Sequence, residues 1–183
     1  MKESRQLRRH HLLETMSELE SAKISCANCT GVCCTFVGNS MQVTPLEAMD
    51  LYQYLQEKGR WDEALELRLR ETISHFRLDQ APPSDGRRTF SRRRYTCPFF
   101  KDQSLGCSIA PEYKPYGCLG FNAIGPGVKD GENCTSRIEV LEKRELAYAD
   151  EGRDNESLRE KYQLQWEKIS IPEALLDLHQ KLN

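Results

Sequence analysis

The chain has 183 residues, of which 30% are charged and 38% hydrophobic, and its formal net charge is −2. This length and balance predict a single domain over residues 1–183 that can bury its own core. The near-neutral charge gives no general reason to expect nucleic acid or an anionic membrane as a partner. No apolar run approaches the roughly 18 residues of a membrane-spanning helix, and the charged N-terminus is unlike a signal peptide. We therefore expect a cytoplasmic protein without a membrane partner.

The first predicted elements are helices. Residues 1–25 contain a charged amphipathic helix, over about 4–22, whose apolar side consists of Leu7, Leu12, Met16 and Leu19. Thr44 and Glu47 form a capping box, with Pro45 at the first helical position. This capping box begins the first of two helices predicted within 45–78, and Gly59 ends it before the second begins near Trp61.

The middle of the chain predicts little regular structure. Residues 81–86 read as a turn, and a strand over 89–95 with a partner at 107–109 predicts at most a small β-hairpin. The proline- and glycine-rich stretch 111–131 is expected to be irregular. Residues 135–183 predict C-terminal helices over about 136–149, 158–169 and 171–182, with a polar linker at 150–155. The expected fold class is mainly α, with helices packed around an irregular, cysteine-rich metal-binding centre at 26–134.

The eight cysteines fall in two zones outside the predicted helices. The first zone is a C-x2-C-x3-C-C run, and the second spreads over 97–134; together they contain Cys26, Cys29, Cys33, Cys34, Cys97, Cys107, Cys118 and Cys134. In a reducing cytosol such a set favours metal binding over structural disulfides or ordinary buried cysteines. A C-x2-C turn brings two thiolates to one metal, and Gly31 allows the tight turn that returns the next pair. All four histidines lie outside both zones, which favours ligation by cysteine alone.

Charge follows the same pattern. Residues 24–46 and 115–128 contain no charged side chain, although 30% of the whole chain is charged. Such segments suit a site shielded from water, where metal and backbone N–H groups balance the thiolates. Adjacent side chains usually point apart, so Cys33 and Cys34 are expected to bind two irons of a cluster or two metals, or to leave one thiol spare. The spacing favours an iron–sulfur cluster slightly over zinc.

The order of several motifs resembles a known family. The C-x2-C-x3-C-C run is followed by Tyr95-Thr96-Cys97-Pro98-Phe99-Phe100, then by Gly106-Cys107-Ser108-Ile109 and Lys114-Pro115-Tyr116-Gly117-Cys118. Together these motifs are similar to the bacterial YkgJ-type cysteine-cluster family, which is described as a zinc- or iron-chelating domain. The resemblance covers about 26–134 and implies that the first seven cysteines form the metal site, while spacing alone adds Cys134. Members of the family are expected to have Arg-Pro before the later cysteine and Arg after it. This chain departs from that pattern, with Lys114-Pro115 before Cys118 and Leu119 after it.

Three functions remain open from the sequence. The favoured hypothesis is a metal-binding protein that acts in electron transfer, metal handling or stabilisation. The second is a cluster- or metal-dependent enzyme that modifies a protein, because the family also resembles a region of flagellin lysine methylases. The third, a metal-stabilised nucleic-acid binder, depends only on a basic patch that would also suit a protein partner or an acidic ligand. That patch contains Arg87, Arg88, Arg92, Arg93 and Arg94.

Overall fold

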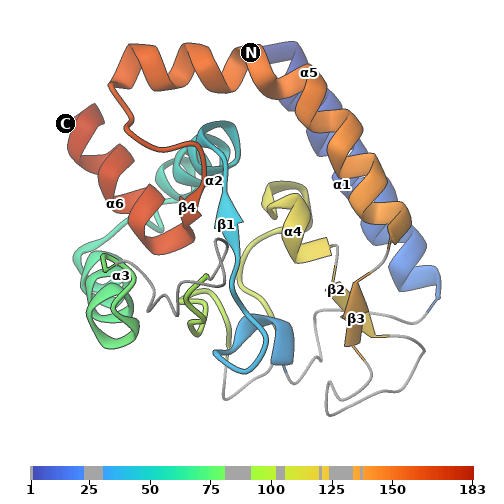
Figure 1. The fold of residues 1–183 in the computed structure, drawn as a ribbon, viewed down its shortest axis with the longest axis horizontal. Coiled ribbons are helices and arrows are strands. Elements are labelled where there is room, and N and C mark those ends of the chain that lie inside the picture. Colours follow the sequence, from blue (N-terminus) through green and yellow to red (C-terminus); the bar gives the residue numbers. More distant parts are fainter. Residues whose placement is uncertain are drawn as a thin grey trace, which may run out of the picture.

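The computed structural model describes residues 2–22, 31–80, 92–101, 106–119, 121–123, 134–136 and 138–183. The described part of the chain is mainly helical, as the sequence predicts (Figure 1). Its α-helices are α1 (Lys2–Ser21), α2 (Pro45–Glu57), α3 (Glu63–Phe76), α4 (Tyr116–Leu119), α5 (Ile138–Tyr162) and α6 (Ile171–Leu182). Two 3₁₀ turns, η1 (Val32–Cys34) and η2 (Pro111–Tyr113), lie in the cysteine-containing segments.

The strands are short and form two antiparallel pairs. β1 (Gln42–Val43) pairs with β4 (Ile169–Ser170), so that Val43 lies opposite Ile169. β2 (Phe121–Ala123) pairs with β3 (Cys134–Ser136), so that Ala123 lies opposite Cys134. The first pair joins residues far apart in the sequence, and it fixes the start of α6 beside the start of α2.

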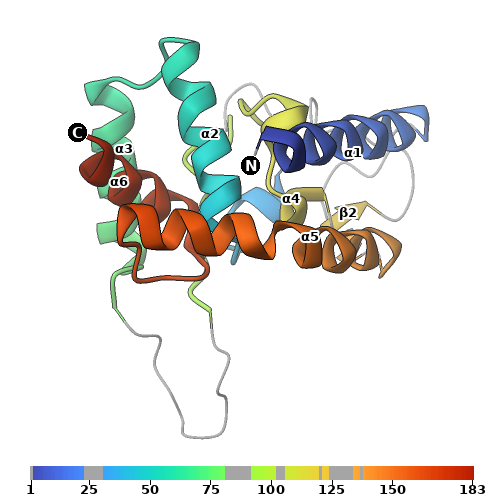
Figure 2. The ribbon, with the colours of Figure 1, turned by 90° about the horizontal axis from the view of Figure 1, so that it is seen from above.

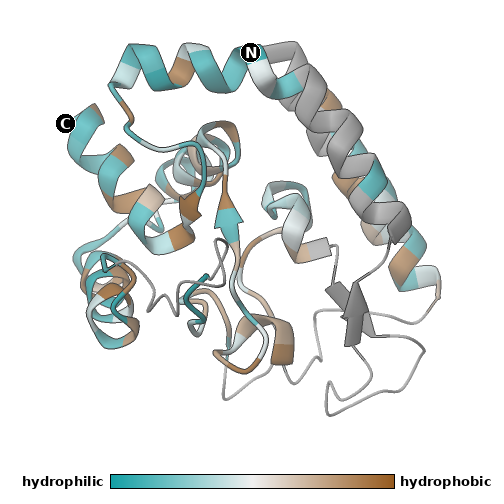
Figure 3. Cartoon of the chain, viewed as in Figure 1, coloured by the Kyte–Doolittle hydropathy of each residue, from teal (hydrophilic) through white to brown (hydrophobic). Residues whose placement is uncertain are grey.

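The hydrophobic core lies where α2, α3 and α6 meet. Leu46, Leu51, Leu55, Leu69 and Leu175 are all fully buried there. Hydrophobic residues in these helices alternate with polar ones, as amphipathic helices require (Figure 3). The end of α5 adds Leu158 to this core, and the segment that carries Cys97 and Phe99 packs against it. The cysteine segments therefore rest on a helical core rather than standing apart from it.

The N-terminal helix packs elsewhere. Figures 1 and 2 show α1 running beside the first part of α5, and α1 also contacts η2 and α4. Leu12, Met16 and Leu19 are buried, as predicted, whereas Leu7 is 47% exposed and does not belong to the buried side. None of the described helices combines the length and hydropathy that crossing a membrane requires.

Local capping residues begin three of the helices. α2 begins with the complete box, in which the Thr44 side chain accepts from Glu47 N–H and the Glu47 carboxylate accepts from Thr44 N–H. α3 begins after Asp62, whose carboxylate accepts from Leu65 N–H. α6 begins after Ser170, whose hydroxyl accepts from Glu173 N–H. In each case a local side chain satisfies N–H groups that the first turn of a helix leaves unpaired.

The predicted break in the C-terminal region is wrong. Residues 150–155 are not a linker, because α5 runs unbroken from Ile138 to Tyr162. The polar residues there have tertiary partners: Asn155 Oδ1 accepts from Leu46 N–H at 2.9 Å. The helix then ends earlier than predicted, since Gln163 has a positive φ of 52° and Leu164 N–H turns back to Arg159 O.

Two predictions for the middle of the chain also need correction. Residues 92–95, the described part of the predicted strand, have no strand partner; Tyr95 instead pairs its backbone with Asn39. In the described residues the expected hairpin is reduced to one β-bridge, between Phe100 and Cys107, which lies after the predicted strand. The stretch 111–131 is not wholly irregular, because η2, α4 and β2 lie in it. Cys118 consequently lies in a helix. The predicted turn at 81–86 lies outside the described residues.

Candidate metal centre

The adjacent cysteines Cys33 and Cys34 lie on the 3₁₀ turn η1. Gly31 precedes this turn with a φ of 79°, in the left-handed region that favours glycine. Its carbonyl accepts hydrogen bonds from Cys34 N–H at 2.7 Å and from Thr35 N–H at 2.9 Å. A methyl group at Gly31 would overlap the ring of Phe100. The tight turn expected at Gly31 is confirmed, and it also creates room for a residue from the next cysteine segment.

The second segment is attached to the first through its backbone. Cys97 N–H donates to Cys34 O at 2.7 Å. Two residues earlier, Tyr95 N–H donates to Asn39 O, and Asn39 Nδ2 donates to Tyr95 O at 2.9 Å. The buried Tyr95 hydroxyl donates to Met41 O at 2.8 Å and accepts from Ile171 N–H, at the start of α6. Cys97 is thereby held between the η1 turn and the helical core.

The third segment folds back on the second. Phe100 and Cys107 form an antiparallel bridge, Ser108 N–H donates to Phe99 O, and Lys101 N–H donates to Gly106 O. Gly106 has a φ of 88°, as a tight reversal requires. The Cys107 sulfur accepts from Ile109 N–H at 3.4 Å. Cys107 therefore lies beside the turn that follows Cys97.

The fourth described segment is the short helix α4, which carries Cys118. Its first residue, Tyr116, donates its N–H to Glu47 Oε1 at 3.0 Å. Glu47 is only 1% exposed, and its other carboxylate oxygen caps α2. One buried carboxylate thus joins the N-termini of two helices, a role beyond the capping box that the sequence predicts. Lys114, just before α4, is also buried.

Burial and the neighbouring sulfurs raise the pKa values of three of these thiols. Burial raises the pKa of Cys97 to about 12, and the nearby Cys107 adds to this rise. Burial, Cys107 and Cys97 raise the pKa of Cys118 far above its usual range, while the charge of Lys114 opposes the rise. A hydrogen bond with Cys33 lowers the pKa of Cys34, but burial and the sulfurs of the other segments raise it by more.

The five cysteines whose side chains the structure describes are free thiols: Cys33, Cys34, Cys97, Cys107 and Cys118. Four separate segments therefore bring four of them, Cys34, Cys97, Cys107 and Cys118, into mutual electrostatic reach. Within the described residues, no three Cys, His, Asp or Glu side chains are placed so that they could hold a metal ion. Cys26 and Cys29 lie outside the described residues. The backbone of Cys134 lies in β3, at the end next to Ala123.

The chemistry of the described donors fits zinc or an iron–sulfur cluster. All of the grouped donors are cysteine thiols, the ligands that both kinds of centre use. The histidines lie elsewhere: His10 and His11 are exposed on α1, His75 is exposed on α3, and His179 contacts Tyr52 and Glu66. Buried thiolates need positive charge nearby, which a metal ion supplies. Without such a charge, burial and the neighbouring sulfurs disfavour the thiolate form, which is why the pKa values of Cys97 and Cys118 are raised.

The basic patch contributes to local structure where it is described. Arg93 Nε donates to Gln80 O at 2.9 Å, and Arg94 Nη1 donates to Val37 O at 2.8 Å. Arg92 is exposed, while Arg87 and Arg88 lie outside the described residues. At least two of the five arginines therefore bind the protein's own backbone, and this gives no support for a nucleic-acid site.

No protein-family profile, curated protein or solved structure matches this chain.

Proposed function

We propose that this chain is a metal-binding protein whose cysteines hold an iron–sulfur cluster or zinc, with a role in electron transfer, metal handling or stabilisation. One observation carries the proposal: Cys34, Cys97, Cys107 and Cys118 come from four separate segments of the sequence and gather in one place, where Cys97 is buried and the other three are half-buried. Free thiols are reactive, and apolar residues would fill the same space without loss of packing. A group of several thiols therefore favours a shared ligand over a packing role.

The residues nominated for the centre follow from this grouping and from the sequence. Cys33, Cys34, Cys97, Cys107 and Cys118 would supply the described part of the ligand set. Cys26, Cys29 and Cys134 complete the proposed set on sequence spacing. When bound, zinc would supply fixed positive charge, and a cluster would in addition supply one-electron chemistry. The charge of buried Lys114 beside Cys118 would add to the balance of negative thiolates.

The first test is an anaerobic purification, followed by a visible spectrum and elemental analysis for iron, zinc and acid-labile sulfide. A brown protein with matching iron and sulfide supports a cluster, and a colourless protein with stoichiometric zinc supports a zinc site. A colourless, metal-free protein that also fails to take up either metal on reconstitution would contradict the proposal.

A variant at the best-anchored cysteine tests the ligand set. Replacing Cys97 with alanine should reduce the bound metal and lower stability, because metal binding and folding are linked. Metal loss could also follow from destabilisation alone, so the control is Leu69→Ala. Leu69 is fully buried in the helical core, and its truncation costs about 2–5 kcal/mol. We expect Leu69→Ala to keep its metal per folded protein; full metal content in Cys97→Ala would exclude Cys97 as a ligand.

A further inference from the structure

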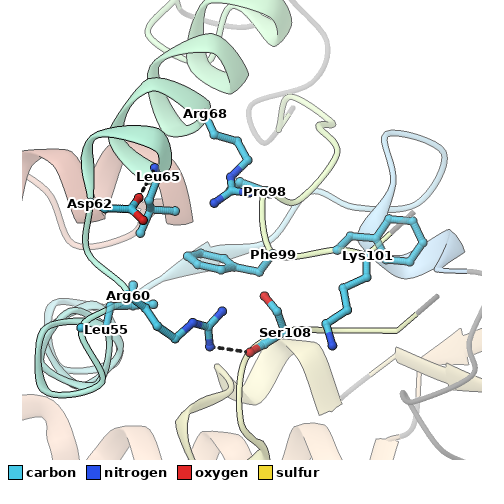
Figure 4. Close-up of a pocket in the computed structure, with 11 residues that line it drawn as sticks. Leu55, Arg60, Asp62, Leu65, Arg68, Pro98, Phe99, Lys101 and Ser108 are labelled. Atoms are coloured by element: carbon cyan, nitrogen blue, oxygen red, sulfur yellow. Dashed lines mark hydrogen bonds between the residues drawn. The ribbon is translucent and has the colours of Figure 1, made fainter. Parts of the chain in front are cut away.

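A cavity next to the cysteine segments is lined by three cationic side chains, those of Arg60, Arg68 and Lys101. It has a volume of about 330 Å³ and lies between α3 and the segments that follow Cys97 and Cys107. Figure 4 shows Arg60 and Arg68 on either side of Phe99 in that view, with Lys101 and Ser108 at the same cavity. These cations share no signal in the sequence, because they are separated by up to 41 positions and meet only in the fold.

Arg60 is fixed in place before any ligand arrives. Its Nη1 atom donates to Ser108 O at 2.8 Å and to the Tyr54 hydroxyl at 3.1 Å. Its guanidinium group also lies 5.7 Å from the centre of the Tyr54 ring. In the described part of the chain no acceptor faces the Nη2 and Nε atoms of Arg60. A positioned guanidinium with spare donors suits the oxygens of a phosphate group.

The other two cations have no competing acid. Arg68 and Lys101 form no ion pair with any carboxylate among the described residues. Among the described residues, the acid that lines the cavity is Asp62, whose carboxylate accepts from Leu65 N–H at 2.7 Å and caps α3. The described lining of three cations and one carboxylate has a charge of about +2, which suits a dianion better than a monocarboxylate.

Part of the wall is apolar. Its accessible apolar surface belongs to the half-buried Pro98 and Phe100, while Leu55, Leu65 and Phe99 are at least 97% buried and support the wall from behind. The volume is at the lower end of the range for small-molecule sites, about 300–1,000 Å³. A bare inorganic anion would leave this apolar surface unused.

We propose that this cavity binds a small organic molecule through a phosphate monoester group, with Arg60, Arg68 and Lys101 on the phosphate and the half-buried Pro98 and Phe100 against the organic part. The site is separate from the described part of the proposed metal centre, because none of the described cysteines lines it. It is joined to that centre through the chain: Phe99 lies two residues after Cys97, and Ser108, which holds Arg60, directly follows Cys107.

The test is isothermal titration of the protein as purified, at constant ionic strength set with sodium chloride, against three probes. These are inorganic phosphate, phenyl phosphate and acetate. We expect phosphate to bind, acetate to bind much more weakly, and phenyl phosphate to bind at least about five-fold more tightly than phosphate because its ring reaches the apolar wall. No saturable binding of phosphate or phenyl phosphate would overturn the proposal. Equal affinity for phosphate and phenyl phosphate would overturn the assignment of Pro98 and Phe100 to the organic part.

Charge variants provide the matched control. Arg68→Gln and Lys101→Gln should each weaken phenyl phosphate binding about ten-fold, since each removes one charged hydrogen-bond donor. Arg70→Gln removes an equally exposed arginine from the same helix, one that pairs with Glu66 and does not line the cavity. It should change the affinity by less than about two-fold. If Arg70→Gln weakens binding as much as the other two, the effect is one of general charge and the site is refuted. Because none of these positions is a cysteine, the result is independent of whether metal is bound.

Discussion

Gly31 shows at the residue scale how the cysteine segments depend on close backbone approach. Its positive φ makes the η1 turn, and its missing side chain leaves room for the Phe100 ring. Gly59, at the end of α2, offers a natural comparison. It also has a positive φ, of 60°, but no atom lies within 4 Å of the position where a methyl group would be added. The two glycines thus separate a backbone requirement from a packing requirement.

Replacing each glycine with alanine should separate the two costs. Gly59→Ala should lower the free energy of unfolding by about 1 kcal/mol, the cost of holding alanine at positive φ. Gly31→Ala should lower it by a further 1–3 kcal/mol or so, because the rigid Phe100 ring must move. Both values come from equilibrium urea unfolding.

A double variant checks the cause. In a Phe100→Ala background the extra cost at Gly31 should disappear, because the two sites are in direct contact and their effects are then not additive. An extra cost at Gly31 that persists in that background would show that something other than Phe100 limits the space.

At the scale of elements, the sequence predicted helix starts better than helix continuity. Thr44, Glu47 and Ser170 act through bonds within one turn, so their residue types alone predict where α2 and α6 begin. The sequence predicts a linker around Asn155 because the partners of this polar stretch are distant. Asn155 binds the N-terminus of α2, which no local pattern shows. The sequence predicts a strand at Tyr95 for the same reason, since its partner Asn39 is 56 residues away.

The candidate site was predictable to a similar degree. Clustered cysteines indicated a common site, and the structure brings four of the described thiols near one another. The residues that support them were not predictable. Glu47 carries a local signal for a helix cap and none for its bond to Tyr116, and Lys114 gives no sign in the sequence that it is buried beside Cys118.

Glu47 links two elements, and its substitution tests that link. In Glu47→Gln, an NH₂ group must replace one of two oxygens that both accept from backbone N–H groups, those of Thr44 and Tyr116. One buried donor is then left facing another donor, and we expect a loss of about 1–3 kcal/mol in the free energy of unfolding. Glu57→Gln, an exposed change at the other end of α2, should cost less than about 0.5 kcal/mol. A value for Glu47→Gln as small as the control's would show that α4 does not depend on this carboxylate.

At the scale of the whole molecule, two kinds of structure share one core. The helices α2, α3 and α6 pack through fully buried leucines. The cysteine segments instead depend on a few backbone hydrogen bonds, such as those of Cys97 and Ser108, and on whatever the thiols bind. Apolar packing persists when a ligand leaves, whereas a loop organised by a metal loses the binding free energy that orders it. The two parts should therefore respond differently to metal removal.

Chelation of the proposed metal should loosen the cysteine segments while most of the helix remains. Hydrogen exchange would be compared before and after chelation at the amides of Cys97, Ser108 and Cys118, and at those of Leu51 and Leu55 in α2. We expect protection to fall by at least about ten-fold at the first three and to change little at the other two, because local opening need not involve the core. Far-UV circular dichroism should keep most of its helical signal. Loss of the whole helical signal on chelation would instead show that the metal holds the entire fold together, and that the leucine core is too weak to stand without it.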